Sequence, residues 1–363
     1  MLKRIDIYID RLLASYGQPD DYASLVRIAY ALYYLIFFWP SAVWLTSIPD
    51  LLYYPPAISL GRFLFSDGFP SRELLFGLFC IQGIAAVALL FGVFTKASGI
   101  ILCLATTLTL NFQYSLAKID HVFLFVVVPA VLAFSNWGNR FALLPSKQKG
   151  ARAFALLALF IGFGYFTAGL AKAPNWLDLD LSTCGVRAWW IDKNVSGTNE
   201  SILDPLLRTL PTWGWEALDL SALVFEIGFL VAFFWRKAFC VFVFVALFFH
   251  LINYVMLGIG FPFMTVVFAA FGCAQSLAFL TNRETNNESR KAKSLAGWLV
   301  FALLALACVV PIGTTTYLRK SISAVVTFIF PPNTVTPSIL AVGCCVGVWM
   351  VASQLSRPPC NNE

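Results

Sequence analysis

Apolar windows about 20 residues long recur along almost the whole of this 363-residue chain. A helix of that length crosses the hydrocarbon core of a bilayer, which is about 30 Å thick. Hydrophobic residues make up 59% of the sequence and charged residues only 12%. Soluble domains do not have this composition. The sequence therefore predicts an all-α, polytopic integral membrane protein.

Ten windows are predicted to cross the membrane, and they lie at 24–47, 74–94, 97–117, 119–136, 153–172, 218–235, 238–257, 261–280, 296–317 and 338–355. We expect three parts: an amphipathic interfacial segment (1–23), a transmembrane domain (24–280), and additional C-terminal helices with a short tail (281–363). The expected fold is a helical bundle of about 8–10 membrane helices without a soluble C-terminal domain.

The segment before the first span combines charged residues with apolar residues at helical spacing. Ile5, Ile9, Leu12, Leu13 and Tyr16 fall on one face. A helix with this pattern lies in the membrane interface, with its apolar face against the lipid.

Lysine and arginine are distributed unevenly between the predicted loops. If both termini are cytoplasmic, the inside segments hold 15 of these 25 residues and the outside segments hold 8, while Arg27 and Lys172 lie in spans. An excess of basic residues marks cytoplasmic loops. The sequence therefore predicts a protein of the cytoplasmic (inner) membrane with both termini inside. The net charge of +6 is then explained by topology and contact with membrane lipid, so no nucleic-acid partner is expected.

Two longer segments fall on the outer side in this topology. Segment 173–217 contains paired tryptophans and acidic residues, and we interpret it as a reentrant or interfacial cap over the outer end of the bundle. Segment 48–73 is rich in proline, glycine and aromatic residues and is expected to form the other part of a lid.

Four of the ionisable residues in or beside the apolar spans are candidates for a functional site, because a charge there costs about 2.5–3.5 kcal/mol and needs a reason. Lys172 ends the fifth span and is either an anchor reaching to the interface or a base that loses hydration beneath the cap. His121 and His250 are either packing residues or acid–base groups, and Glu226 is either a tie between helices or part of a site. The topology places all four in the outer leaflet, which favours a shared functional site.

Three stretches resemble motifs of the vitamin K-dependent γ-glutamyl carboxylase family, which belongs to the broader horizontally transferred transmembrane (HTTM) domain. "YFTAGLAKAPNW" (165–176) is similar to its lysine motif, and "FFHLINYVMLGIGFPFMTVVFAA" (248–270) to its histidine helix. "KIDHVFLFVVVPAVLAFSNWGNRFAL" (118–143) is similar to its polar-histidine helix. The resemblance covers about residues 20–280 and implies a carboxylase-like transmembrane domain.

The resemblance implies that Lys172 is the base that deprotonates a reduced, vitamin K-like quinone. Oxygenation by O₂ would yield a base strong enough to deprotonate glutamate, which then takes up CO₂. His250 and His121 are the implied supporting catalytic residues. The pocket or its support is expected to include Glu226, Tyr165, Asn253 and Trp176. No metal is expected, since no ligand spacing is present.

Two hypotheses of different class remain open from the sequence. The first is a membrane oxidoreductase or lyase-like enzyme that uses a reduced quinone, with a separate protein or peptide substrate if carboxylation is retained. The second is a non-catalytic membrane partner or immunity-type protein that keeps the HTTM fold. Convergence of Lys172 and both histidines on one cavity would favour the first.

The predicted topology can be tested with a cysteine-free variant that carries Ser196→Cys in segment 173–217. We expect an impermeant maleimide to label this cysteine in intact cells, because the distribution of basic residues places the segment outside. Labelling only after cell lysis would contradict the orientation.

Overall fold

The structure is a computed structural model that describes residues 2–57, 59–116, 122–178, 183–195, 203–257 and 259–272. The predicted spans 296–317 and 338–355 lie outside the described residues, as does His121. The helices of the described part group into two compact units. We call residues 16–157 the α2–α6 unit, and residues 2–15 with 158–272 the α7–α12 unit.

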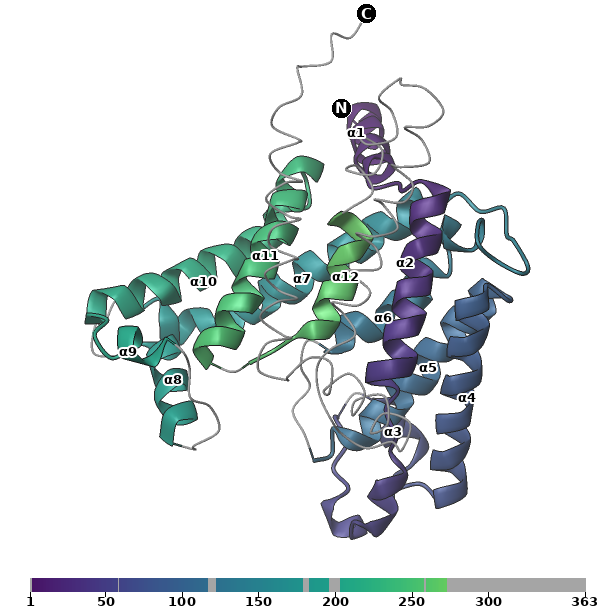
Figure 1. The fold of residues 1–363 in the computed structure, drawn as a ribbon, viewed down its shortest axis with the longest axis horizontal. Helices are drawn as coiled ribbons and strands as arrows, with labels where there is room; N and C mark the ends of the chain where they lie inside the picture. Colours follow the sequence, from purple (N-terminus) through teal and green to yellow (C-terminus); the bar gives the residue numbers. More distant parts are fainter. Residues whose placement is uncertain are drawn as a thin grey trace, which may run out of the picture. The chain divides into compact units, whose positions relative to one another are not determined.

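The α2–α6 unit is built around three helices that pack in chain order (Figure 1). Helix α4 lies along α5, and α5 lies along α6. The α-helices of this unit are α2 (Asp20–Tyr33), α3 (Leu60–Leu64), α4 (Arg72–Phe91), α5 (Thr95–Gln113) and α6 (Val122–Leu132).

The α7–α12 unit contains most of the residues predicted for the functional site. Helices α10 and α11 contact each other, and α11 also contacts α12. The helices are α1 (Leu2–Ser15), α7 (Ala151–Trp176, which enters this unit at Ala158), α8 (Gly185–Val195), α9 (Asp204–Leu207), α10 (Thr212–Ala232), α11 (Arg236–Leu257) and α12 (Pro262–Gly272).

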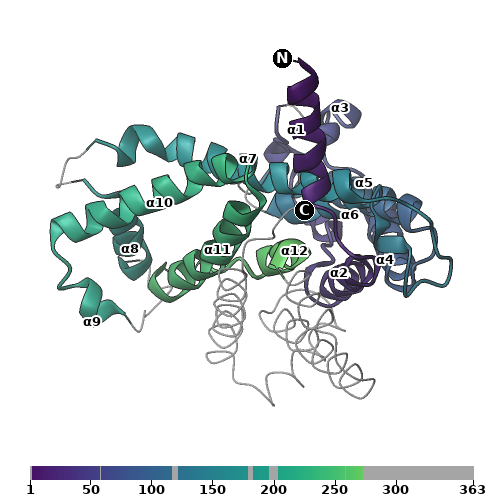
Figure 2. The same ribbon diagram turned by 90° about the horizontal axis from the view of Figure 1, so that it is seen from above.

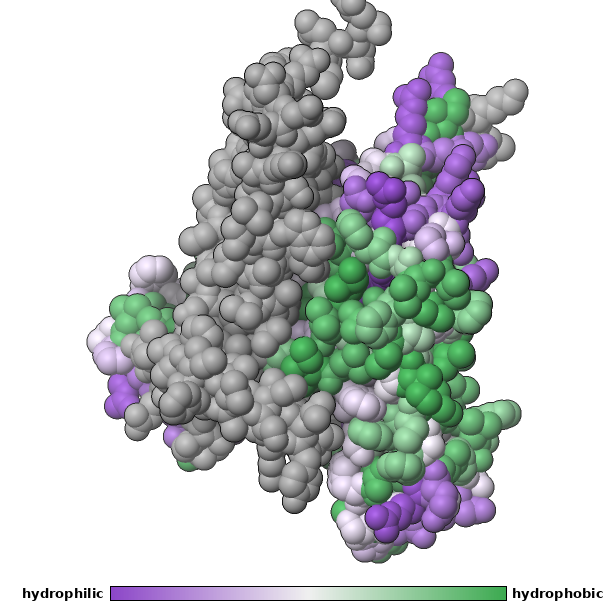
Figure 3. Space-filling view, turned by 45° about the vertical axis from the view of Figure 1, so that its right-hand side comes forward, coloured by the Kyte–Doolittle hydropathy of each residue, from purple (hydrophilic) through white to green (hydrophobic). Residues whose placement is uncertain are grey.

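Within the described residues, 5 helical segments are long and apolar enough to cross a membrane. They are Asp20–Ser47, Arg72–Phe91, Thr95–Gln113, Ala151–Trp176 and Arg236–Leu257. On the face drawn in Figure 3, hydrophobic residues form a band between two hydrophilic ends, as expected for a surface in contact with lipid. The prediction of a helical integral membrane protein is confirmed.

The first predicted span changes its helical geometry partway along. The α-helix ends at Tyr33, a π-helical turn follows over Tyr34–Phe38, and a 3₁₀ turn covers Val43–Ser47. The cause is Pro40, because proline lacks an N–H and disfavours helical backbone in the residue before it. Sequence periodicity alone predicted one uninterrupted helix here.

Other boundaries differ from the prediction in ways that affect the site. Helix α7 continues to Trp176, four residues past its predicted end, and α10 begins at Thr212, six residues before its predicted start. The described part of helix α6 covers 11 residues, Val122–Leu132, and contains Pro129. The hydropathy signal locates the apolar centre of each helix, whereas its ends depend on contacts outside the apolar stretch.

The amphipathic N-terminal segment is helical over Leu2–Ser15, as predicted. Ile5 and Ile9 remain exposed, and the Tyr8 hydroxyl donates to the carbonyl oxygen of Phe234 at 3.0 Å. This polar contact ties α1 to α10 and its following turn within the α7–α12 unit, while Ile5 and Ile9 stay accessible and Leu12 and Leu13 are half-buried.

A buried hydrogen-bond network joins three helical segments in the core of the α2–α6 unit. The Tyr34 hydroxyl lies 2.7 Å from Gln82 Oε1, to which it donates, and 2.6 Å from Thr106 Oγ1. Gln82 Nε2 donates to Thr109 Oγ1 at 2.6 Å. Each side chain is buried, so these bonds supply partners that lipid cannot provide.

Gln82→Leu should lower the free energy of unfolding by about 1–2 kcal/mol, because it removes two buried hydrogen bonds while keeping the side chain's approximate volume. Reversible unfolding in mixed micelles measures the change. The neighbouring Ile81→Leu, at a position 45% exposed, is the control and should have little effect. Equal stability of Gln82→Leu and wild type would show that the network does not hold these helices together.

Candidate functional site

The last turns of α7 carry the lysine that the sequence predicted to be functional. Lys172 Nζ lies 2.5 Å from Glu226 Oε1 of α10, and their side chains are 21% and 2% exposed. The same ammonium lies 5.1 Å from the centroid of the Trp176 ring, one helical turn further along α7. Lys172 is therefore held inside the protein by a carboxylate and an aromatic face, and does not extend freely to the interface.

Two glycines on α7 explain why Lys172 and Glu226 can meet. A Cβ atom at Gly169 would lie 3.0 Å from Glu226 Cβ, and one at Gly162 would lie 3.2 Å from Leu230 Cα. The order of these contacts shows that α7 and α10 run antiparallel. Small residues at such positions allow two membrane helices to approach closely.

A second polar pair lies two turns before Lys172 on the same face of α7. The Tyr165 hydroxyl and His250 Nε2 of α11 are 2.5 Å apart, and both side chains are buried. Tyr165 is also close enough to Glu226 for an electrostatic interaction. The two pairs therefore form one cluster, in which α7 provides Tyr165 and Lys172, and α10 and α11 provide their partners.

Aromatic rings enclose the Tyr165–His250 pair. The Tyr165 ring stacks on Phe229 with 4.7 Å between centroids. The His250 ring lies 5.0 Å from Phe261 and 5.9 Å from Phe268. This surrounding is apolar and planar, which suits contact with an aromatic, lipid-soluble ligand.

The remaining predicted site residues, Trp176, Asn253 and His121, are not members of the two polar pairs. Trp176 lies against Gly185 at the start of α8, and its ring is 6.0 Å from that of Trp189. Asn253 is half-buried one turn after His250, and its carbonyl oxygen accepts from the amide of Ile259 at 3.4 Å. His121 lies outside the described residues, so its predicted role stays a prediction.

Asp219 is a buried carboxylate that the sequence reasoning missed. Its two oxygens accept from the amides of Gly185 and Val186 at 2.6 and 2.8 Å, and the side chain is 0% exposed. These amides are among the unpaired donors at the N-terminus of α8, where a negative charge is favourable. Asp219 lies seven residues before Glu226, so both fall on one face of α10, and this spacing is the sequence signal that could have found it.

Helices α8 and α9 pack at the end where α10 begins, as both views of the fold show (Figures 1 and 2). Trp190 Nε1 donates to Asp204 Oδ1 at 2.9 Å, and its ring lies 5.5 Å from that of Trp215. A buried apolar cluster joins this region to the end of α11, and its members are Cys184, Leu207, Trp215, Met256 and Leu257. We call α8 and α9 the cap.

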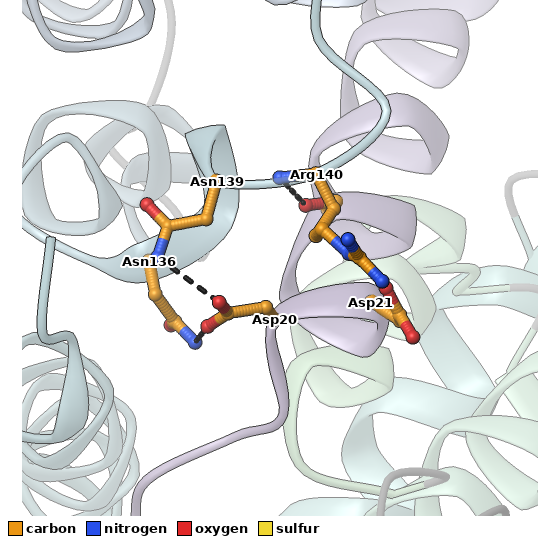
Figure 4. Close-up of polar contacts among 6 residues, drawn as sticks. Asp20, Asp21, Asn136, Asn139 and Arg140 are labelled. Carbon is orange, nitrogen blue, oxygen red and sulfur yellow. Dashed lines mark hydrogen bonds and ion pairs between the residues drawn. The ribbon is translucent and has the colours of Figure 1, made fainter. Parts of the chain in front are cut away.

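The α2–α6 unit has its own polar cluster near the start of α2 (Figure 4). Asp20 accepts from Asn136 Nδ2 at 2.6 Å and from Asn139 Nδ2 at 3.2 Å. Asp21 pairs with Arg140 at 3.0 Å, although both side chains are more than 60% exposed. These contacts fix the loop of residues 136–140, which follows the predicted polar-histidine helix, to α2. The Asn and Arg side chains of this loop therefore have a structural role.

Arg27 is fully buried in the same unit, one to two turns further along α2. Its Nη2 donates to the carbonyl oxygen of Phe141. Gly92 has a positive φ of 70°, and a Cβ there would lie 2.5 Å from Arg27 Nη1. Glycine at this position therefore both ends α4 and leaves room for the guanidinium.

No family model, curated protein or solved structure matches this chain. The carboxylase-like interpretation accordingly rests on the motif resemblance and on the geometry of the cluster. Among the described residues, no group of three or more His, Cys, Asp or Glu side chains is placed to hold a metal ion.

The reactivity of the Cys184 thiol can be used to test how the cap contacts α10. Cys184 directly precedes α8, and its thiol donates to Glu216 Oε1 of α10 at 3.2 Å. Burial, and then this hydrogen bond and the charge of Glu216, raise the pKa of Cys184 to about 11. In a variant without the other cysteines, alkylation should therefore be slow at neutral pH and rise with pH towards that value, since the thiolate is the reactive form.

Glu216→Gln should move the midpoint of this alkylation profile to lower pH, because the variant loses the negative charge beside the thiol. Asp192→Asn, an exposed position on α8, is the matched control and should leave the midpoint unchanged. An unchanged midpoint in Glu216→Gln would argue against the Cys184–Glu216 contact.

Proposed function

We propose that this protein is a membrane enzyme that oxygenates a reduced quinone at the Lys172–Glu226 site. The observation that carries the proposal is the cluster itself, in which a buried carboxylate holds the Lys172 ammonium two turns along the same face of α7 from the Tyr165–His250 pair. Acid–base groups gathered from three helices into an apolar, aromatic surrounding are typical of sites that move protons.

A reduced quinone fits this surrounding. The quinol is soluble in lipid because its planar ring is apolar, and its hydroxyl groups need polar partners within the membrane. Trp176 and the phenylalanines around Tyr165 and His250 provide planar surfaces. Lys172 is the residue to which the quinol hydroxyl would give its proton.

The reaction balances with O₂ as oxidant, because a hydroquinone and O₂ give a quinone epoxide and water. The residues of the chain bind and orient the quinol, exclude water and accept its hydroxyl proton. His250 and Tyr165 would hold the second polar group of the ligand. Carboxylation of glutamate by CO₂, a lyase-type reaction, would use a separate protein or peptide.

The cap lies on the outer side of the cytoplasmic membrane in the topology that the basic residues favour, and both termini lie inside. The site is then in the outer leaflet, where quinone in the membrane can reach it.

One observation favours a second candidate function. Each of the two polar pairs joins two helices, and buried hydrogen bonds or ion pairs between membrane helices can serve structure alone. A non-catalytic partner or immunity-type protein would keep such ties without turning over a quinone.

Lys172→Arg and Lys172→Ala should both lower the rate of quinone epoxide formation by about 10²–10⁴, the usual contribution of a positioned acid–base group. Arginine keeps the positive charge, but its guanidinium does not release a proton in the working pH range. The measurement supplies the purified protein with reduced naphthoquinone and O₂, and chromatography quantifies the epoxide.

Lys193→Arg on the cap is the matched control and should retain the wild-type rate. Equal epoxide rates in wild type and Lys172→Arg would remove Lys172 from the chemistry. If no variant and no wild-type protein makes epoxide, the non-catalytic function is favoured.

A further inference from the structure

The buried carboxyl group of Glu226 has two oxygens in different situations. Oε1 binds the Lys172 ammonium, whereas Oε2 is buried and has no hydrogen-bond partner within the described residues. A carboxylate carries negative charge on both oxygens, so burying one of them without a donor is costly. A proton on the group would leave a neutral carbonyl oxygen at that place, which is less costly to bury.

The contact with Lys172 offers a short route for such a proton. Nζ and Oε1 are 2.5 Å apart, within the range of a strong hydrogen bond. Transfer along this bond converts an ammonium–carboxylate pair into an amine–carboxylic acid pair. The net charge of the pair stays at zero, so no new charge has to be buried.

We propose that Glu226 is the final proton acceptor of the site and that Lys172 passes the proton to it. The Lys172 ammonium gives a proton to Oε1, and the freed lone pair on Nζ then takes the hydroxyl proton of a bound phenol or quinol. The O–H bond of the ligand breaks and its electron pair stays on oxygen. The products are a ligand oxyanion, the Lys172 ammonium beside it, and a neutral Glu226 acid.

This inference rests on the proposed function, because it names the partner of the base in the same site. Glu226 would be more than a tie between α7 and α10, since a lysine without a carboxylate within reach has no place in the protein to which it can deliver its proton.

The test is infrared difference spectroscopy of the full-length protein with 4-nitro-1-naphthol, a naphthol whose ionised form is coloured. At a pH where the free naphthol is un-ionised, binding to wild type should produce the colour of the naphtholate. The difference spectrum should then show the C=O band of a newly protonated carboxyl group, shifted to lower frequency in D₂O. A residue that only ties helices would give no such band.

Glu226→Gln should bind the naphthol without the carboxyl band. Glu216→Gln is the matched control on the same helix and should keep the band. Should Glu226→Gln fail to fold, Glu226→Asp replaces it, and the band should change frequency because the acid is different. No band in wild type, or an unchanged band in either Glu226 variant, would overturn the inference. A band without epoxide formation would leave Glu226 as proton acceptor and reject the oxygenase function.

Discussion

Lipid offers no hydrogen-bond partner, so each polar group carried by an apolar helix must be satisfied by another part of the protein. In the α7–α12 unit this requirement determines which face of α7 meets its neighbours. Tyr165 and Lys172 lie two turns apart on one face, and their partners are His250 and Glu226. Gly169 lies between them and lets α10 come close enough for the ion pair to form.

The Lys172–Glu226 pairing also enables the cluster to transfer a proton. An ammonium and a carboxylate at hydrogen-bond distance can exchange a proton without changing their summed charge, which an isolated buried lysine cannot do. A structural tie and a proton-transfer site therefore require the same geometry here. The two roles are distinguished by measuring which group holds the proton after a ligand binds. A measurement of stability does not distinguish them.

The cap depends on a polar contact of the same kind. Asp219 is buried, and it is satisfied by the first amides of α8. Because Asp219 and Glu226 share a face of α10, this helix holds the cap with one carboxylate and Lys172 with the other. Trp176 links the two regions, since its ring contacts both Lys172 and the start of α8. The start of α8 is thus positioned next to the end of α7 that carries Lys172.

The sequence by itself determined the fold class and the identity of most of the cluster. Hydropathy depends only on composition within about 20 residues, so the apolar helices could be located without any knowledge of their neighbours. Lys172, His250 and Glu226 could be singled out because an ionisable residue in an apolar helix is costly unless it has a partner or a function, whereas Tyr165 followed from the motif resemblance. The tertiary structure decided which of them pair, and it also revealed Asp219 and the break of the first span. Partners that lie 54 or 85 residues apart are set by helix packing, about which local patterns carry no information.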